Sequence, residues 1–165
     1  MIDNKYKIMF VCTGNTCRSP MAEGALRKLL EKNHSGKFEI VSSGIAAGVG
    51  FPATKFAQEA VKIWEIDISQ HMSQPLTEDL IENSDLIIAM STEHYHEVSR
   101  INPGADEKTY LLKSFPDMTG FGESVEDPIG MPLDQYNEVF LEIGECLGVN
   151  LDQIIKLMEA KSYAE

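Results

Sequence analysis

The sequence has few cysteines, few basic residues and no long apolar run, and each shortage excludes a class of protein. The 3 cysteines in 165 residues are an odd number, so they do not make the disulfide framework of a small secreted domain. No apolar run approaches the roughly 20 residues of a membrane-spanning helix, and the first residues lack the profile of a signal peptide. We therefore expect a cytoplasmic protein with reduced cysteines and no membrane partner.

Basic side chains are outnumbered, with 14 Lys and Arg against 26 Asp and Glu, and the formal net charge is −12. This charge argues against nucleic acid or an anionic membrane as a partner. It also means that any phosphate-binding site must create its positive potential locally, from backbone amides and a few side chains. No repeat or linker divides the chain, and its length suits one domain, residues 1–165, with a substantial core.

Short apolar runs alternate with helical patterns along the chain, and this alternation predicts the fold class. Strands are predicted at residues 7–12, 38–41, 85–90 and 108–112, while residues 66–68 suit either a short strand or a loop entry. Helical spacing of apolar residues follows each of the predicted strands. Such alternation implies parallel strands and right-handed crossovers. We therefore expect an α/β fold in a single domain, with a four-stranded central parallel sheet flanked by helices on both faces.

The turn between the first strand and the first helix has the features of a phosphate-binding loop. Gly14 can adopt a positive φ and Asn15 tolerates the left-handed region, so the turn can aim successive N–H groups inward as an anion-binding nest. Ser19 and Pro20 predict the helix start, as a hydroxyl cap and a first-turn proline, and the helix adds its positive dipole end. Arg18 supplies a planar, charged fork that matches two phosphate oxygens.

Cys12 opens this loop at the end of the first strand, the edge at which parallel sheets bind ligands. The field of the loop should favour its thiolate, because thiol pKa values near 8.5 fall to roughly 3.5–7.5 in such places. The Ser19 hydroxyl could also donate to the sulfur. We therefore expect Cys12 to be a nucleophile held beside the oxygens of a phosphate-sized anion. The alternative is a buried cysteine in an ordinary strand-to-helix turn.

Other uses of the loop are excluded or disfavoured by what it lacks. It is not a Walker-type nucleotide loop, because no Gly-Lys-Ser or Gly-Lys-Thr follows, and its cysteines do not have the Cys-x-x-Cys spacing of a redox motif. Zinc is disfavoured because Cys12 and Cys17 lack a second ligand pair. Cys17 could be a packed small hydrophobe, or it could trap an oxidised Cys12 as a disulfide.

For the other candidate site residues, the sequence alone gives weaker evidence of a function. Residues 114–132 form a long predicted loop, and long loops in compact domains are usually functional. Asp127 in this loop could act as an acid toward a leaving group, but Asp-Pro is also a common turn pair. His94 and His96, two positions apart on a predicted helix, should face different sides as solvent residues, and Cys146 should belong to the core.

The segment VCTGNTCRSP, residues 11–20, resembles the signature of the low-molecular-weight protein tyrosine phosphatases. The resemblance covers nearly the whole chain. It includes the Ser43-Gly44 turn, His71, and the Asp127-Pro128 pair late in the sequence.

This resemblance implies a phosphoprotein phosphatase that works through a phosphocysteine intermediate and requires no metal or cofactor. Cys12 would be the nucleophile, Arg18 would bind the phosphoryl oxygens, and Asp127 would be the acid for the leaving group and then the base for water. The implied partners are phosphorylated protein substrates, with inorganic phosphate as product and inhibitor, and the chain is expected to be a monomer or a weak homodimer. The implied phosphate-binding residues are Thr13, Gly14, Asn15, Thr16, Cys17 and Arg18, and the implied supporting network is Asn15, Ser19, Ser43 and His71.

Departures from the family pattern bear on the substrate. Phosphotyrosine-specific members often carry Ile or Leu where Thr16 stands, and they tend to have paired tyrosines where this chain has Ile129 and Gly130. The substrate slot would then be less aromatic, with Thr16, Phe51 and Ile129 as its walls. The Thr16 form resembles the bacterial branch that removes phosphate from protein arginine. Phosphotyrosine and phosphoarginine therefore both stay open as substrates.

Two alternatives from other classes are also open. Arsenate reductase uses a similar scaffold but needs additional resolving cysteines, and none lies between Cys17 and Cys146. A phosphoryl carrier or phosphopeptide-binding module could use the same loop without turnover, but it would not need the acid at Asp127. One further departure from the family stands at Ser91, where other members carry an aspartate after Met90.

Overall fold

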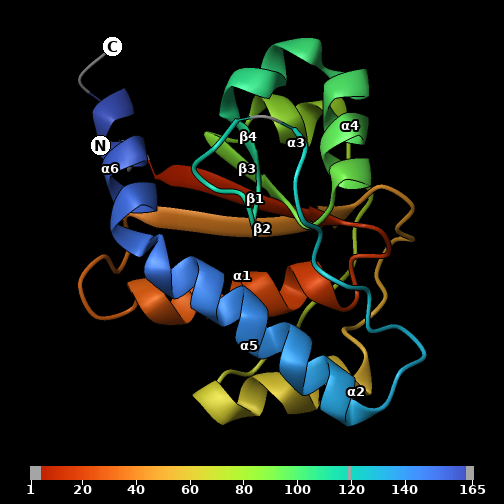
Figure 1. The fold of residues 1–165 in the computed structure, drawn as a ribbon. Coiled ribbons are helices and arrows are strands. Elements are labelled where there is room, and N and C mark those ends of the chain that lie inside the picture. The colour runs from red at the N-terminus through yellow and green to blue at the C-terminus, as the bar shows by residue number, and fades with distance from the viewer. Residues whose placement is uncertain (1–4, 119, 163–165) are drawn as a thin grey trace.

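The apolar runs of the sequence form one parallel sheet. The structure, a computed structural model, describes residues 5–118 and 120–162. The four strands lie in the order β2-β1-β3-β4 (Figure 1). Their bounds are Tyr6–Cys12 for β1, Phe38–Gly44 for β2, Leu86–Ala89 for β3 and Thr109–Leu111 for β4. The central strand β3 is buried throughout, because helices cover both faces of the sheet.

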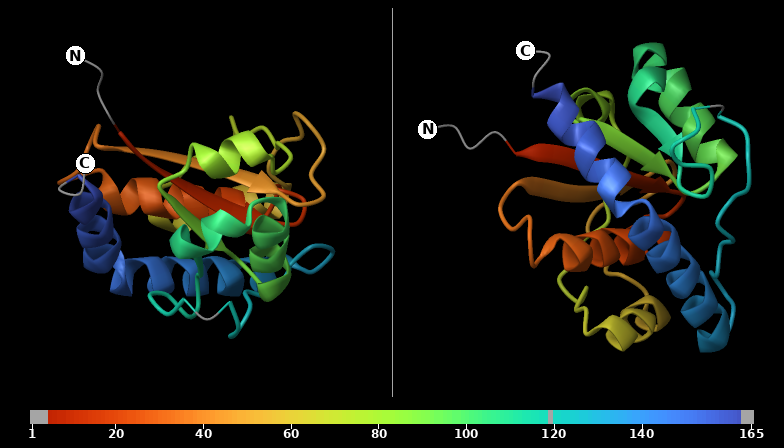
Figure 2. Two further views of the ribbon diagram at one scale, coloured as in Figure 1. Left: turned by 90° about the horizontal axis from the view of Figure 1, so that it is seen from above. Right: turned by 60° about the vertical axis from the view of Figure 1, so that its left-hand side comes forward.

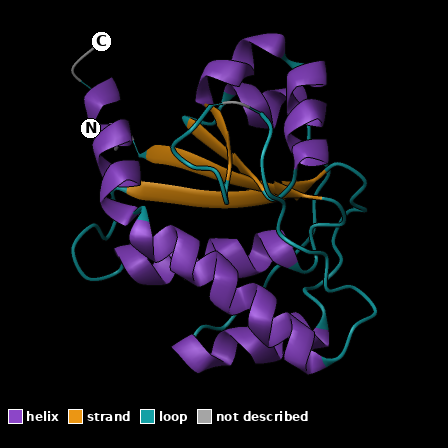
Figure 3. Ribbon diagram, in the orientation of Figure 1, coloured by secondary structure: helices purple, strands orange, loops and turns teal. Residues whose placement is uncertain are grey.

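Helices form a layer on each side of the sheet (Figures 1 and 3). The face that carries Phe10 and Cys12 packs against α1 (Arg18–Leu30), α2 (Lys55–Ala60), η1 (Val61–Trp64), α5 (Leu133–Val149) and α6 (Leu151–Lys161). The face that carries Met9 and Val11 packs against α3 (Glu78–Glu82), α4 (Thr92–Ile101) and η2 (Pro103–Lys108). The predicted fold class is confirmed. None of the helices in the described residues has the length and apolar character needed to cross a lipid bilayer.

The structure sets element boundaries that the sequence left open or placed differently. β2 continues to Gly44, which pairs with Cys12, so Ser42 and Ser43 both belong to the strand and point to opposite faces of the sheet. Residues 66–68 are a loop that packs on α1 so tightly that a Cβ added at Gly24 would lie 2.9 Å from Ile66 Cγ2. α1 begins one residue before Ser19, so Ser19 is not the helix cap and its hydroxyl is available for another use. The described part of 114–132 contains no helix or strand, as predicted.

Chain segments distant in sequence meet at the carboxyl ends of β1 and β3. Ile45 N donates to Cys12 O at 2.9 Å, and Met90 N donates to Val11 O at 3.0 Å. Val125 N in turn donates to Met90 O at 2.7 Å. The last bond ties the long loop to the sheet edge, and the right-hand view of Figure 2 shows this loop running along one side of the molecule from β4 to α5. The loop that carries the candidate acid therefore passes the strand end that carries Cys12.

Candidate active site

Asn15 shapes the loop between β1 and α1. It is fully buried and adopts the left-handed conformation, with φ at 57°. Its Nδ2 donates to Ser19 Oγ at 2.8 Å and to Ser42 Oγ at 2.9 Å, and its Oδ1 accepts from Gln74 N at 2.9 Å. His71 Nε2 donates to Asn15 O over 2.6 Å, since a carbonyl can only accept. These bonds hold a backbone conformation that asparagine adopts more readily than most residues.

Cys12 is buried at the base of the loop, and Ser19 Oγ lies 2.8 Å from its Sγ. Burial raises the pKa of the Cys12 thiol. The Ser19 hydroxyl, the Ser19 N–H, the Arg18 charge and the Asn15 N–H all act in the opposite direction and lower this pKa. The predicted lowering is therefore wrong as the net direction, because the sequence shows the donors but not the depth of burial. The predicted contact between the Ser19 hydroxyl and the sulfur is confirmed.

Arg18 is buried beside Cys12 with its guanidinium held by three partners. Nη1 donates to Val125 O at 3.0 Å, and Nη2 donates to Thr13 Oγ1 at 3.3 Å. Nη2 also lies 3.4 Å from Asp127 Oδ2. The Asp127 carboxylate is partly exposed, and its Oδ1 accepts from Ile129 N at 3.1 Å. The structure thus supplies the proximity of Asp127 to the loop, which the sequence could not show.

A small cavity of about 160 Å³ opens over the sulfur. Its lining consists of Cys12, Thr13, Gly14, Thr16, Cys17, Arg18, Asp127 and Ile129. The cavity combines a thiol, a guanidinium and a carboxylate in a space of phosphoryl size. An attacking group, an oxyanion-binding group and a proton carrier are the components that a phosphoryl transfer through a covalent intermediate needs.

Known proteins are similar to this chain in sequence and in fold. The profile described as low molecular weight phosphotyrosine protein phosphatase matches residues 7–160. The chain belongs to this family. It is 39% identical over 140 residues to a protein-arginine-phosphatase of Bacillus subtilis, which is 85% of this chain and 91% of the relative. It is 33% identical over 140 residues to the low molecular weight protein-tyrosine-phosphatase Ptp of Acinetobacter johnsonii, which is 85% of this chain and 92% of the relative.

A solved member of the family has a modified nucleophile position. This YwlE arginine phosphatase, a variant with a phosphorylated active-site serine, matches at a TM-score of 0.83 and 35% identity, covering 91% of this chain and 96% of that chain. A covalent phosphoryl group on the protein fits a cysteine-dependent mechanism. This low-molecular-weight phosphatase is therefore a hydrolase of phosphorylated proteins, and the family resemblance seen in the sequence is confirmed.

Two predicted site residues of this phosphatase lie elsewhere. Ser43 donates to Met9 Sδ at 3.3 Å, on the α4 side of the sheet, whereas Ser42 contacts Asn15. Adjacent residues of a strand point to opposite faces, so a one-residue difference removes Ser43 from the network. Phe51 is 59% exposed and is not part of the cavity lining; its ring folds over Gly48. In the loop, the left-handed residue is Asn15 and not Gly14.

His94 is the clearest error of the sequence prediction for this phosphatase. It is fully buried, whereas His96 is exposed as predicted. His94 Nε2 lies 2.8 Å from Thr13 Oγ1, so α4 contributes directly to the loop's support. Burial lowers the pKa of His94 to about 3, and the nearby Arg18 charge adds to this lowering, so the imidazole is neutral at physiological pH.

Sequence reasoning also missed Glu23 on α1. Its Oε2 accepts from Ser42 Oγ at 2.6 Å and lies 3.9 Å from His71 Nδ1, while its Oε1 pairs with Arg27 Nη2 at 2.5 Å. The spacing of Glu23 from Ser19 places both on one face of α1, which is the only sequence signal that could have linked them. Cys17 Sγ lies 3.4 Å from Tyr136 OH, and the partly buried Cys146 packs at the edge of the core as predicted.

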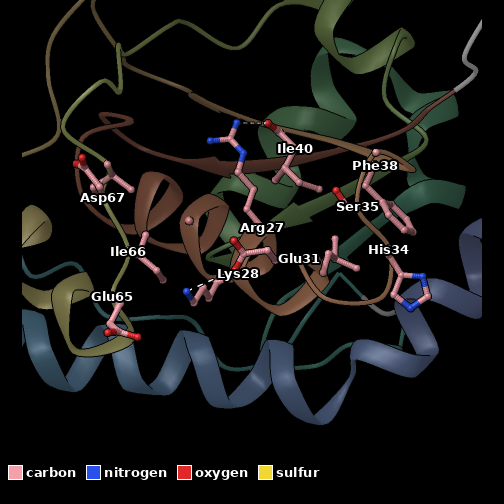
Figure 4. A pocket seen from close by; sticks show the side chains of 14 residues that line it. Arg27, Lys28, Glu31, His34, Ser35, Phe38, Ile40, Glu65, Ile66 and Asp67 are labelled. Atoms are coloured by element: carbon pink, nitrogen blue, oxygen red, sulfur yellow. Dashed lines mark hydrogen bonds and ion pairs between the residues drawn. The ribbon is translucent and has the colours of Figure 1, made fainter.

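A larger cavity of about 420 Å³ lies between α1 and the 65–68 segment (Figure 4). Charged side chains of both signs line it, including Arg27, Lys28, Glu31 and Asp67. None of the loop residues 12–18 belongs to its lining. Size alone would have selected the wrong site, and chemistry selects the small cavity over Cys12.

Proposed function

We propose that residues 12–18 are the catalytic loop, with Cys12 as nucleophile, Arg18 as the phosphoryl-binding group and Asp127 as the proton carrier. The observation that carries this proposal is the 3.4 Å separation of Arg18 Nη2 and Asp127 Oδ2 in the cavity that Cys12 also lines. A carboxyl group in that position lies beside the group that binds the phosphoryl oxygens. It can therefore reach the atom that leaves phosphorus.

In the first step, the Cys12 thiolate attacks phosphorus and forms the sulfur–phosphorus bond. The bond from phosphorus to the leaving atom breaks, its electron pair stays on that atom, and Asp127 gives that atom its proton. The backbone N–H groups of the loop and the Arg18 guanidinium hold the phosphoryl oxygens. The Ser19 hydroxyl, 2.8 Å from Sγ, stabilises the thiolate before the attack.

In the second step, water attacks the phosphocysteine and the sulfur–phosphorus bond breaks. Asp127, now a carboxylate, takes the proton of the attacking water, and inorganic phosphate and the Cys12 thiolate are released. The Ser19 hydroxyl again stabilises the sulfur as it leaves. Both steps thus use the same three groups, and Asp127 returns to its protonated form for the next turnover.

The decisive test compares two cysteine substitutions in the hydrolysis of p-nitrophenyl phosphate. Cys12→Ser should reduce turnover by at least about 10³-fold, because it removes the nucleophile. Cys146→Ser, on α5 at the edge of the core, is the matched control and should keep the rate. Turnover that survives Cys12→Ser would refute the mechanism. A single stoichiometric phosphorylation of Cys12 without turnover would indicate a phosphoryl carrier.

We further propose that phosphoarginine in proteins is the preferred substrate. The cavity lining contains Thr16 and Ile129 and no aromatic ring, so it does not offer the aromatic walls that would enclose a phosphotyrosine ring. The Thr16 hydroxyl can accept from a guanidinium N–H or position the attacking water, which an aliphatic side chain cannot do. The similarity to a relative named protein-arginine-phosphatase supports the same substrate.

Thr16→Ile tests this substrate preference. Wild type should hydrolyse phosphoarginine peptides with a higher kcat/KM than phosphotyrosine peptides of the same sequence. Thr16→Ile should lower the ratio of kcat/KM for phosphoarginine to kcat/KM for phosphotyrosine by about tenfold or more, because one hydrogen bond to a charged group contributes about 1.5–3 kcal/mol. Thr16→Ser keeps the hydroxyl and should retain the wild-type ratio. A preference for phosphotyrosine that neither substitution alters would sink the proposal.

Inorganic phosphate should inhibit the reaction competitively, because the product can return to the N–H groups and the guanidinium that hold the phosphoryl group. We propose that the phosphatase acts in the cytoplasm, where its free Cys12, Cys17 and Cys146 stay reduced, as a monomer or weak homodimer. Steady-state inhibition by phosphate and sedimentation at several protein concentrations test the first and last of these statements.

A further inference from the structure

His94 occupies an unusual place for a histidine at the start of a helix. It lies in the first turn of α4, after the end of β3, and its side chain is fully buried. Its Nδ1 lies 2.9 Å from Ser91 Oγ, and its Nε2 lies 2.8 Å from Thr13 Oγ1. Both ring nitrogens are therefore engaged, one by the residue that caps its own helix and the other by the catalytic loop.

The donors and acceptors around Thr13 allow two arrangements of the protons. Arg18 can only donate, so Thr13 Oγ1 uses one lone pair to accept from Nη2 at 3.3 Å. The hydroxyl has a second lone pair and one proton, so it can either donate to an unprotonated His94 Nε2 or accept from a protonated one. In the first arrangement, the single proton of the neutral imidazole sits on Nδ1 and is donated to Ser91 Oγ. This first arrangement directs the Thr13 proton away from Arg18, and it is the one in which His94 orients the Thr13 hydroxyl.

We propose that His94 is a positioning residue, which holds the Thr13 hydroxyl in the orientation that accepts a hydrogen bond from Arg18. The inference rests on the proposed role of Arg18 in binding the phosphoryl group. Thr13 and Asp127 share one nitrogen of Arg18, since Nη2 carries two N–H groups and lies 3.3 Å from Thr13 Oγ1 and 3.4 Å from Asp127 Oδ2. When Thr13 is held, Arg18 has a neutral partner inside the loop, and Asp127 can carry a proton for the leaving group.

Loss of the Thr13 acceptor would leave Asp127 and the Val125 carbonyl as the partners of the guanidinium. The Arg18–Asp127 ion pair would then tighten, which holds Asp127 in its charged form and draws Arg18 away from the phosphoryl oxygens. Two consequences follow for the kinetics. The inhibition constant of inorganic phosphate should rise because Arg18 binds it less well, and kcat should fall because Asp127 donates a proton less well.

The test is a double-mutant cycle of Thr13→Val and His94→Leu, with kcat, KM and the inhibition constant of inorganic phosphate measured for each variant. Each single variant should lower kcat/KM by about tenfold and weaken phosphate binding, because each removes one hydrogen bond of the series from His94 through Thr13 to the charged Arg18. The double variant should be no worse than either single variant, because both remove the same link. Effects that multiply in the double variant would overturn the proposal.

Matched controls separate positioning from general destabilisation. His96→Leu makes the same substitution at an exposed position of the same helix and should keep the rate. His94→Gln and Thr13→Ser retain a hydrogen-bonding atom and should recover most of the activity. A His94→Leu variant that loses thermal stability but keeps wild-type kcat, KM and phosphate inhibition would show that His94 is only structural.

Two further measurements keep the proposal testable if His94→Leu does not fold. Nitrogen-15 NMR of the wild-type His94 ring should show a proton on Nδ1 and none on Nε2, and the opposite tautomer would overturn the assignment. Thr13→Val should still lose activity where Thr13→Ser does not. If Cys12→Ser abolishes turnover while Thr13→Val equals wild type, this inference fails and the proposed mechanism stands. If Cys12→Ser keeps turnover, the proposed mechanism itself fails.

Discussion

Two sets of hydrogen bonds hold the same loop from opposite faces of the sheet. On the α1 face, Ser19 meets the Cys12 sulfur, and Asn15 joins Ser19 to Ser42. Ser42 then donates to the carboxylate of Glu23, so this sulfur-side network ends in a charged group. On the α4 face, the network from Thr13 through His94 to Ser91 is neutral throughout and serves the guanidinium.

The two networks differ because one contacts the Cys12 sulfur, which reacts as an anion, and the other contacts the Arg18 cation. A carboxylate in direct contact with Cys12 would oppose its thiolate, so Glu23 is separated from the sulfur by three neutral side chains. Burial, and after it the Arg18 charge, lowers the pKa of His94 and keeps it neutral, so no charged imidazole in contact with Thr13 opposes Arg18. Each network thus keeps unfavourable charge away from its own reactive group. Breaking them one at a time should have separable effects.

The largest effect should come from Asp127→Asn, which removes the charged partner on the guanidinium side. Turnover of substrates with poor leaving groups should fall by about 10²–10⁴-fold, because the proton donor is lost. Phosphate binding should improve or stay equal, since Arg18 loses a competing anion. Glu126→Gln, one residue earlier and exposed, is the control and should keep the rate. Equal losses in the two variants would show that Asp127 is not the proton carrier.

A smaller effect should come from Ser19→Ala, which removes the hydroxyl that contacts the Cys12 sulfur in the sulfur-side network. The hydroxyl is the first of the groups that lower the pKa of Cys12, so its loss raises that pKa. A higher pKa means less thiolate at a given pH, so alkylation of Cys12 by iodoacetamide should need a higher pH than in wild type. Ser43→Ala, on the opposite sheet face, is the control. An unshifted profile in Ser19→Ala would contradict the role of the hydroxyl.

Protonation of His94 should have the smallest effect on the rate at neutral pH. It should, however, change the stability of the fold at acidic pH. Its pKa is about 3 in the folded protein and near 6.5 when unfolded, so the unfolded chain binds the extra proton between these values. The contribution of His94 to stability is therefore complete above about pH 6.5 and is lost as the pH falls toward 3, at about 1.4 kcal/mol per pH unit.

Urea unfolding between pH 6.5 and pH 4.5 measures this contribution. His94→Gln should flatten the decrease in unfolding free energy, whereas His96→Gln, at an exposed position, should leave it unchanged. Parallel curves for wild type and His94→Gln would show that the neutral imidazole does not limit acid stability. The test also separates the two networks, since no change on the sulfur side is expected to alter this slope.

The sheet and the loop over residues 12–18 could be predicted because their signals are local. Buried parallel strands appear as continuous apolar runs, and the loop contains a cysteine, an asparagine that tolerates the left-handed region and an arginine within one short segment. The substrate slot could not be predicted equally well. The missing tyrosines left Phe51 as a predicted wall of the slot, but its ring folds over Gly48.

The supporting residues depend on three-dimensional facts that a linear pattern does not contain. Whether Ser42 or Ser43 reaches the loop depends on strand register, which a shift of one residue reverses. The spacing of His94 and His96 separates the two side chains on α4 but does not show that His94 is buried against Thr13. The net pKa direction at Cys12 depends on burial, which is a property of the whole packed domain.

Both backbone polar groups of Val125 are hydrogen-bonded near the site. Its N–H donates to Met90 O, and its carbonyl accepts from Arg18 Nη1. This residue fixes the long loop only two positions before Asp127. The position of the Asp127 carboxyl group therefore depends on the two residues after Val125 and not on the length of chain between β4 and Val125. Insertions between β4 and Val125 should therefore be tolerated, whereas insertions between Val125 and Asp127 should displace the carboxyl group from Arg18.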